Sequence, residues 1–82
     1  MSKIDDVFKN FLDKGTKIHI RVLEDEVVLI QGNRESLKLL GTLFLTLAES
    51  DEEKIQAGPR GAGSVFFNKK SELGIYINRT SE

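Results

Sequence analysis

The sequence predicts an α+β domain in which two helices pack on one face of an antiparallel sheet of about four strands. Two segments carry apolar residues at helical spacing, and several short segments alternate between apolar and polar residues. The connections between neighbouring strands are too short for parallel crossovers. The expected order is helix, strand, strand, helix, strand, strand. The 82 residues form a single domain, 1–82.

The first helix is expected over residues 2–15, where positions 4, 7, 8, 11 and 12 place apolar side chains on one helical face. Ser2 is suited to cap the N-terminus. Asp5 and Asp6 suit the positive end of the helix dipole. Gly15 is a suitable residue for the end of the helix.

Residues 16–23 and 27–31 are predicted to form an antiparallel hairpin around a short acidic turn, 24–26. In the first strand, His19 and Arg21 alternate with apolar residues and are expected to face away from the helices. The second strand, VVLIQ, is apolar on both faces. Two pairs therefore remain candidates for its outer face, Val27 with Leu29 or Val28 with Ile30.

The second helix is expected over residues 32–50, with Asn33 as its N-cap. Its apolar arc approaches half of the circumference, which is more than a surface helix requires. We therefore expect the first helix, or another subunit, to pack against it. The main stripe comprises Leu37, Leu40, Phe44, Leu47 and Ala48, widened by Leu39 and Leu43, with Leu45 nearly alone on the other side.

The last third of the chain is predicted to hold a polar, glycine-rich loop at 50–63 and a second hairpin. Its strands are expected at 64–68 and 73–79, joined by the turn KKSE. Tyr76 and Asn78 alternate with apolar residues and should lie on the outer face of the sheet. Aromatic and aliphatic residues with polar neighbours on an open face are typical of a partner surface.

The segment AGPRGAGSVFF resembles a phosphate-binding loop only superficially. A Walker loop needs Gly-Lys-Ser/Thr at the start of a helix. Here Gly61, Gly63 and Ser64 lead instead into β-branched and aromatic residues. The segment is therefore interpreted as a flexible connection that leads into a strand. Arg60, at its tip, is placed to reach a partner protein.

Composition argues against several functions. The net charge is −1, there is no cysteine, and His19 is the one histidine, so no metal site, cofactor or catalytic constellation is expected. We therefore expect a protein that is not an enzyme. The N-terminus does not have the pattern of a signal peptide, and no apolar run is long enough for a membrane span, so a cytoplasmic location is expected.

Residues 27–79 resemble a known family. The residues that carry the resemblance are the strand and Leu-rich helix VVLIQGNRESLKLLGTLFLTLAES, the glycine loop, and the closing SELGIYINR. They resemble the small immunity proteins of bacterial polymorphic toxin systems, specifically the immunity protein 32 type. The resemblance implies a cytoplasmic protein that neutralises a cognate toxin by direct contact. It implies no catalytic residues.

Under this hypothesis, a few buried anchors and a charged rim would recognise the partner. The predicted anchors are Tyr76, Phe66 and Arg60, and Glu24, Asp25 and Glu26 would steer association. Arg21, on the outer face of the first hairpin, completes the predicted surface.

Three other functions remain open. A nucleic-acid or nucleotide binder would use Tyr76 and Phe66 with the basic residues Arg21, Arg60, Lys69, Lys70 and Arg79. The overall charge makes nucleic acid an unlikely partner. A homodimer would use the apolar arc of the second helix or the open sheet face. A small enzyme would pair His19 with a carboxylate.

Overall fold

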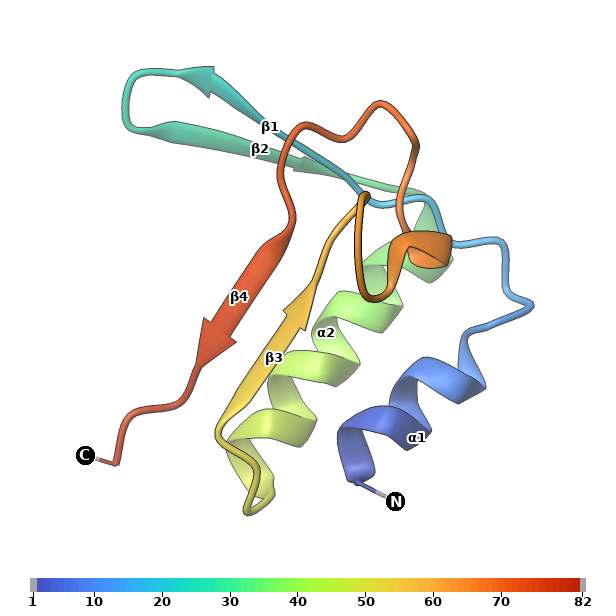
Figure 1. The fold of residues 1–82 in the computed structure, drawn as a ribbon, viewed down its shortest axis with the longest axis vertical. Helices are drawn as coiled ribbons and strands as arrows, with labels where there is room; N and C mark the ends of the chain where they lie inside the picture. Colours follow the sequence, from blue (N-terminus) through green and yellow to red (C-terminus); the bar gives the residue numbers. More distant parts are fainter. Residues whose placement is uncertain (1, 82) are drawn as a thin grey trace.

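A computed structural model describes residues 2–81 as an α+β domain with the predicted order of helices and strands (Figure 1). Its principal extents are 33 × 33 × 22 Å. A short 3₁₀ helix, η1, lies between the last two strands. The elements are α1 (Lys3–Asn10), β1 (His19–Glu24), β2 (Val27–Gln31), α2 (Arg34–Glu49), β3 (Lys54–Ala57), η1 (Ser64–Phe66) and β4 (Ile75–Asn78).

The four strands form two separate antiparallel pairs, β1–β2 and β3–β4, so the prediction of one four-stranded sheet is wrong. The cause lies at the outer edge of β1, which the connection between η1 and β4 occupies. Ile18 forms a parallel bridge with Phe67, and the N–H groups of Glu72 and Leu73 donate to the Ile20 carbonyl at 2.9 and 3.0 Å. Around Ile18 and Ile20 this edge is therefore unavailable to another strand.

The third strand is β3, which lies within the segment expected to be a loop. The predicted strand at 64–68, with its hairpin to 73–79, is wrong because Gly63 has a φ of +76° and the chain turns into η1 there. Phe66 and Phe67 are both buried, which an exposed alternating strand does not allow. In β3, Ile55 and Ala57 are buried and their neighbours are exposed.

Helix α1 is shorter than expected. Ser2 Oγ accepts the N–H of Asp5 at 3.0 Å, which confirms the predicted cap. The regular helix ends at Asn10, and residues 11–15 form turns that finish at Gly15, whose φ is +72°. This positive φ explains why glycine stands at that position.

Helix α2 begins as predicted, since Asn33 Oδ1 accepts the N–H of Ser36 at 2.9 Å. Its buried face differs from the prediction. Leu39 and Leu43 are fully buried because α1 and β3 lie on their side of the helix. Leu37, Phe44 and Ala48, assigned to the main stripe, are exposed instead.

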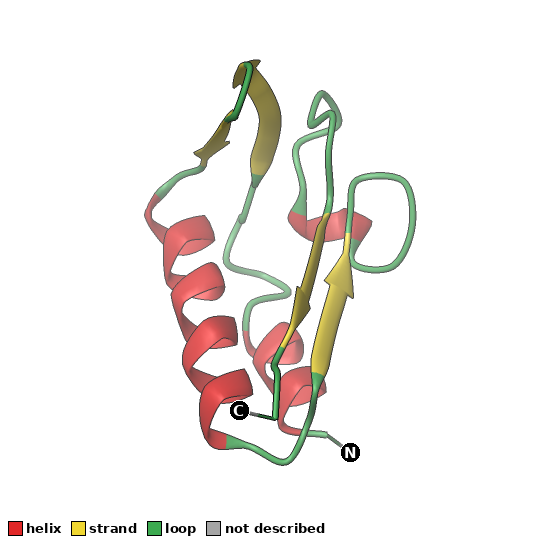
Figure 2. Ribbon diagram, turned by 90° about the vertical axis from the view of Figure 1, so that its left-hand side faces the viewer, coloured by secondary structure: helices red, strands yellow, loops and turns green. Residues whose placement is uncertain are grey.

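Helix α2 and the β3–β4 pair form two layers side by side (Figure 2), and the core joins residues of both helices, β3, the root of β1 and the segment around η1. The expectation that the first helix packs against the second is confirmed. The β1–β2 hairpin crosses the top of both layers and projects beyond them (Figure 1). Within residues 2–81, no helix is long and apolar enough to cross a membrane.

Candidate protein-binding surface

The β1–β2 hairpin forms an arm whose far end is exposed on both faces. Its register pairs Val22 with Val28 and Arg21 with Leu29. Beyond its buried root the arm makes only marginal contact with other helices and strands. Four large apolar side chains lie on this end. These are Val22, Leu23, Val27 and Val28, with exposed fractions of 39–53%.

The tip of the arm is a tight acidic turn. Glu24 pairs with Val27 across a register shift, which leaves Asp25 and Glu26 as the two turn residues. Glu26 has a φ of +70°, a left-handed conformation that costs a non-glycine residue about 1 kcal/mol or more. The turn therefore holds three exposed carboxylates together next to the apolar end of the arm, and one of them is on a strained residue.

The root of the arm, by contrast, is tied to the body. Ile18 and Ile20 are buried, and the N–H of Ile18 donates to the carbonyl of Phe66 at 3.0 Å. Ser71 Oγ accepts the N–H of Ile20 at 2.8 Å and lies within hydrogen-bond distance of the Ile20 and Leu73 carbonyls. The arm therefore extends from a well-anchored base.

A second apolar feature lies below the arm. The inner faces of β2 and β4 and one side of α2 enclose a groove of about 300 Å³. Phe44 on α2 and Tyr76 on β4 both line it, and both are more than half exposed. The groove is lined mainly by apolar side chains, among them Val28, Ile30, Leu40, Phe44, Leu73 and Tyr76.

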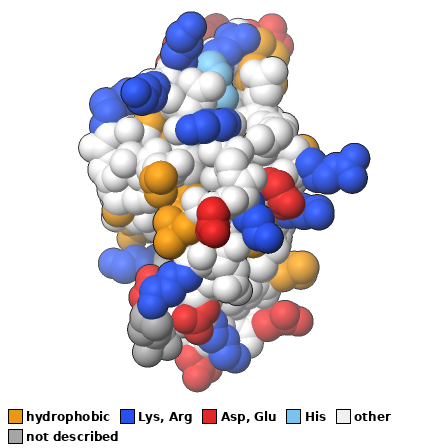
Figure 3. Space-filling model, turned by 90° about the vertical axis from the view of Figure 1, so that its right-hand side faces the viewer, with side chains coloured by type: hydrophobic (Ala, Val, Ile, Leu, Met, Phe, Trp, Pro, Cys, Tyr) orange, Lys and Arg blue, Asp and Glu red, His pale blue; other side chains and the backbone are white. Residues whose placement is uncertain are grey.

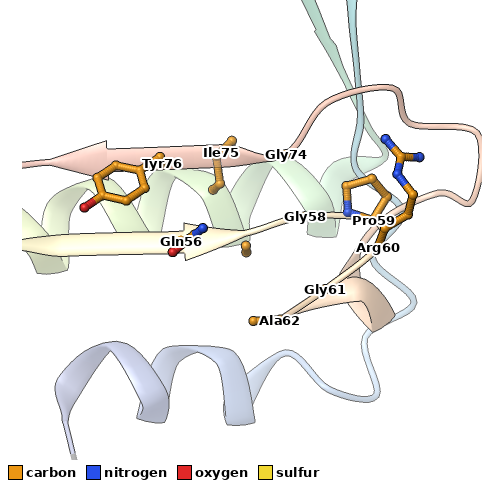
Figure 4. Close-up of a pocket in the computed structure, with 10 residues that line it drawn as sticks. Gln56, Gly58, Pro59, Arg60, Gly61, Ala62, Gly74, Ile75 and Tyr76 are labelled. Carbon is orange, nitrogen blue, oxygen red and sulfur yellow. The ribbon is translucent and has the colours of Figure 1, made fainter.

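The glycine loop surrounds a separate, shallow pocket of about 400 Å³ at the end of β3–β4 (Figure 4). Arg60 points away from it. Its guanidinium donates to the carbonyls of Ser71 and Glu72, at 3.4 and 2.8 Å, so Arg60 fastens the loop to the connection that precedes β4. The loop is also closed by the Gly58 N–H, which donates to the Ala62 carbonyl at 2.9 Å. The segment is thus an internally bonded turn that leads into a 3₁₀ helix, not into a strand.

The predicted surface residues therefore separate into groups. Arg21, Glu24, Asp25 and Glu26 all lie on the arm. Tyr76 is exposed on β4. Phe66 is buried, and its ring centroid lies 5.1 Å from that of Phe8, so it is a core residue and is unavailable as a surface anchor.

Val27 and Val28, which the sequence left as alternatives for the outer face of the second strand, are both exposed. Val22 and Leu23 were not predicted as surface residues, although the exposed apolar side of α2 agrees with the wide arc of the predicted helix. The second strand is apolar on both faces, and the arc of the second helix is wider than one neighbour can cover. Since Leu45 and Phe44 are both more than half exposed, the excess apolar arc is solvent-facing within the described chain.

The predicted nucleic-acid residues do not form one patch. Lys69 and Lys70 lie in the connection beside the root of the arm, whereas Arg79 follows β4 at the other end of the sheet, where its N–H donates to the Glu53 carbonyl. Figure 3 shows Lys and Arg side chains near the histidine at the top of one face. Acidic and basic groups are mixed lower down that face.

Among residues 2–81, no group of three or more histidine or acidic side chains is placed to hold a metal ion. His19 is half-buried and pairs with Gln31 on β2. No family model matches the chain, and comparisons with curated proteins and with solved structures also gave no match.

Proposed function

We propose that this chain is a protein-binding module that uses its arm as the contact element. The observation that carries the proposal is the end of the arm, where four large apolar side chains are exposed beside three carboxylates. An isolated two-stranded hairpin is marginally stable in water. Exposed apolar residues on such an element are therefore better explained by recognition than by stability of the free chain.

The chemistry of the arm defines the partner that it fits. Val22 and Val28 form a cross-strand apolar pair that suits a hydrophobic pocket, and Glu24, Asp25 and Glu26 suit a basic rim. Charges at a rim chiefly raise the association rate, whereas the desolvated apolar centre lowers the dissociation rate. The proposed partner is a protein with a basic cleft around an apolar floor.

The resemblance to immunity proteins gives this partner a biological class. We propose an immunity-type inhibitor, in which the arm enters and blocks the basic cleft of a cognate bacterial toxin domain. Cytoplasmic toxin domains that act on nucleic acid need basic clefts, because phosphate contacts dominate such binding. An acidic arm supported by a rigid base would compete for such a cleft without any catalysis by this chain.

The test is capture from the native host at moderate salt, with tagged wild-type chain and two single variants. Val28→Asp puts a carboxylate on the apolar end of the arm, and Leu45→Asp makes the same kind of change on an exposed site of α2. We expect one stoichiometric protein with the wild type and with Leu45→Asp, and none with Val28→Asp. Equal capture by both variants, or capture of nucleic acid alone, would contradict the proposal.

The proposed inhibitor function needs a second experiment. The captured protein is expressed in a heterologous host with the wild-type chain, with Val28→Asp, or alone. We expect growth to be arrested unless the wild-type chain is present. Growth that is unaffected by the captured protein would leave the chain a binding module and refute the immunity role.

A further inference from the structure

We propose that this chain also forms a two-fold dimer through the outer edge of β4 and the exposed side of α2, separately from the arm. The dimer would join the β3–β4 pairs of two copies into a four-stranded sheet. The helices of both copies would then lie side by side on one face.

The outer edge of β4 carries unpaired backbone groups. The N–H of Arg79 donates to the Glu53 carbonyl at 2.7 Å, which identifies these two as a hydrogen-bonded pair. In an antiparallel ladder such pairs alternate, so the register of β3 and β4 makes Ile77 and Ile75 the next bonded residues on β4. The N–H and C=O groups of Tyr76 and Asn78 must therefore point away from β3.

The outer edges of β1 and β3 differ from this one, whereas that of β2 (VVLIQ) is also uncharged and belongs to the arm. The outer edge of β1 is covered near Ile18 and Ile20 by the connection before β4. The outer edge of β3 bears Lys54, and lysine is a residue that discourages edge pairing. Strand β4, IYIN, has no charge and no proline, and three of its residues favour strands. It lacks the usual protection against pairing with a second strand.

Helix α2 presents an apolar stripe on the same side of the molecule. Phe44 lines the groove beside β4, and Leu37, Gly41 and Ala48 share its helical face at spacings of three, four and seven residues. All four are exposed. A two-fold axis perpendicular to the sheet at β4 places this stripe against its copy, so one operation covers both features.

The charges at the ends of β4 and the exposed area of the chain agree with a second copy as the partner of this face. Antiparallel pairing of two β4 strands brings the Glu72 end of one beside the Arg79 end of the other, and no like charges face each other within the strand. The described chain exposes 5831 Å², whereas a folded 9.2 kDa monomer exposes about 4,900 Å². The projecting arm and this face share the excess of about 900 Å², and a standard interface buries ~800 Å² on each partner.

The first test is the mass of the full chain in solution by light scattering over a dilution series. We expect twice the 9.2 kDa of the chain at high concentration. Phe44→Glu should weaken dimerisation at least about tenfold, because it buries an unpaired charge at the interface. Leu45→Glu, on the neighbouring exposed site, should leave it unchanged. A wild type that stays monomeric at every concentration, or equal effects of the two variants, would overturn the proposal.

The second test fixes the register and uses the absence of cysteine from the chain. If Tyr76 lies at the two-fold axis, the Cα atoms of two copies are about 5.5 Å apart, within the range for a disulfide. Tyr76→Cys should therefore form a cross-linked dimer under mild oxidation. Gln56→Cys, opposite Tyr76 on β3 and on the same face, should not. Equal cross-linking of both variants, or none of Tyr76→Cys, would refute pairing at this edge.

Discussion

The two antiparallel strand pairs of this molecule have the same ladder and are packed differently. In β3–β4 the inward side chains of Ile55 and Ala57 are buried against the helices. In β1–β2 only the root is buried, and the equally apolar residues farther out are exposed. Burial and strand propensity therefore do not coincide in this molecule. The strongest strand pattern lies where the chain is least buried. The proposed contact with a partner requires such exposed apolar side chains.

The largest expected effect compares two isoleucines on strands. Ile55→Ala removes a side chain that is 2% exposed and should lower the free energy of unfolding by about 2–5 kcal/mol. Ile30→Ala removes one that is 51% exposed and should cost less than about 1 kcal/mol. Urea unfolding at low protein concentration measures both. Similar losses would show that the arm is part of the cooperative core.

The second-largest expected effect on stability is at Gly74, the residue just before β4. A Cβ on Gly74 would lie 2.5 Å from the Ala57 carbonyl oxygen and 2.7 Å from Gly58 Cα. Both contacts are with backbone, so Gly74→Ala should destabilise the fold by about 1–3 kcal/mol. A Cβ on Gly61 meets nothing within 4 Å, and Gly61→Ala serves as the control. Equal losses of thermal stability in Gly74→Ala and Gly61→Ala would contradict the close approach of β3 and β4.

A third change tests how the arm is tied to the body. Ser71→Ala removes the hydroxyl that accepts the buried N–H of Ile20, and it should cost about 1–3 kcal/mol. Amide hydrogen exchange should show faster exchange at Ile20 and along β1 than in β3. Ser64→Ala, at an exposed position, provides the control. Uniform loss of protection across both strand pairs would mean that the arm does not open as a separate unit.

The smallest expected effect is a gain in stability at the acidic tip of the arm. Glu26→Gly relieves the positive φ and should stabilise the chain by up to about 1 kcal/mol. Glu26→Gln keeps the strain and removes only the charge, so it should leave the free energy of unfolding unchanged. Both variants should slow association with a basic partner by a similar factor. A loss of stability with Glu26→Gln would show that the carboxylate itself supports the turn.

Much of the secondary structure was predictable from local pattern. The structure confirms the N-caps Ser2 and Asn33, the first hairpin and the strand around Tyr76. Each was predictable because it depends on residues that are close in the sequence. Strand β3 was not predictable, since KIQA has only two apolar residues and its partner lies far along the chain. The exposure of Phe44 was also hidden, because periodicity defines an apolar arc but not which half of it other elements cover.

The acidic tip and Arg21 could be predicted as one group because a short turn keeps them together. Phe66 could not be assigned correctly, since its burial depends on the positive φ of Gly63 and the turn that follows. Arg60 likewise looked free in sequence, whereas its guanidinium is held by carbonyls of a segment that folds back onto it. Long-range contacts therefore decided the roles of both.

The bridge between Ile18 and Phe67 has a consequence for the order in which the chain folds. The first hairpin closes over a two-residue turn and can form within about 1–10 μs. Strands β3 and β4 pair only after residues 58–74 have closed a much longer loop, and the same segment must dock on β1. The locally encoded hairpin is thus expected to form first. The late-forming contacts at residues 67–73 would then set the folding rate of the whole domain.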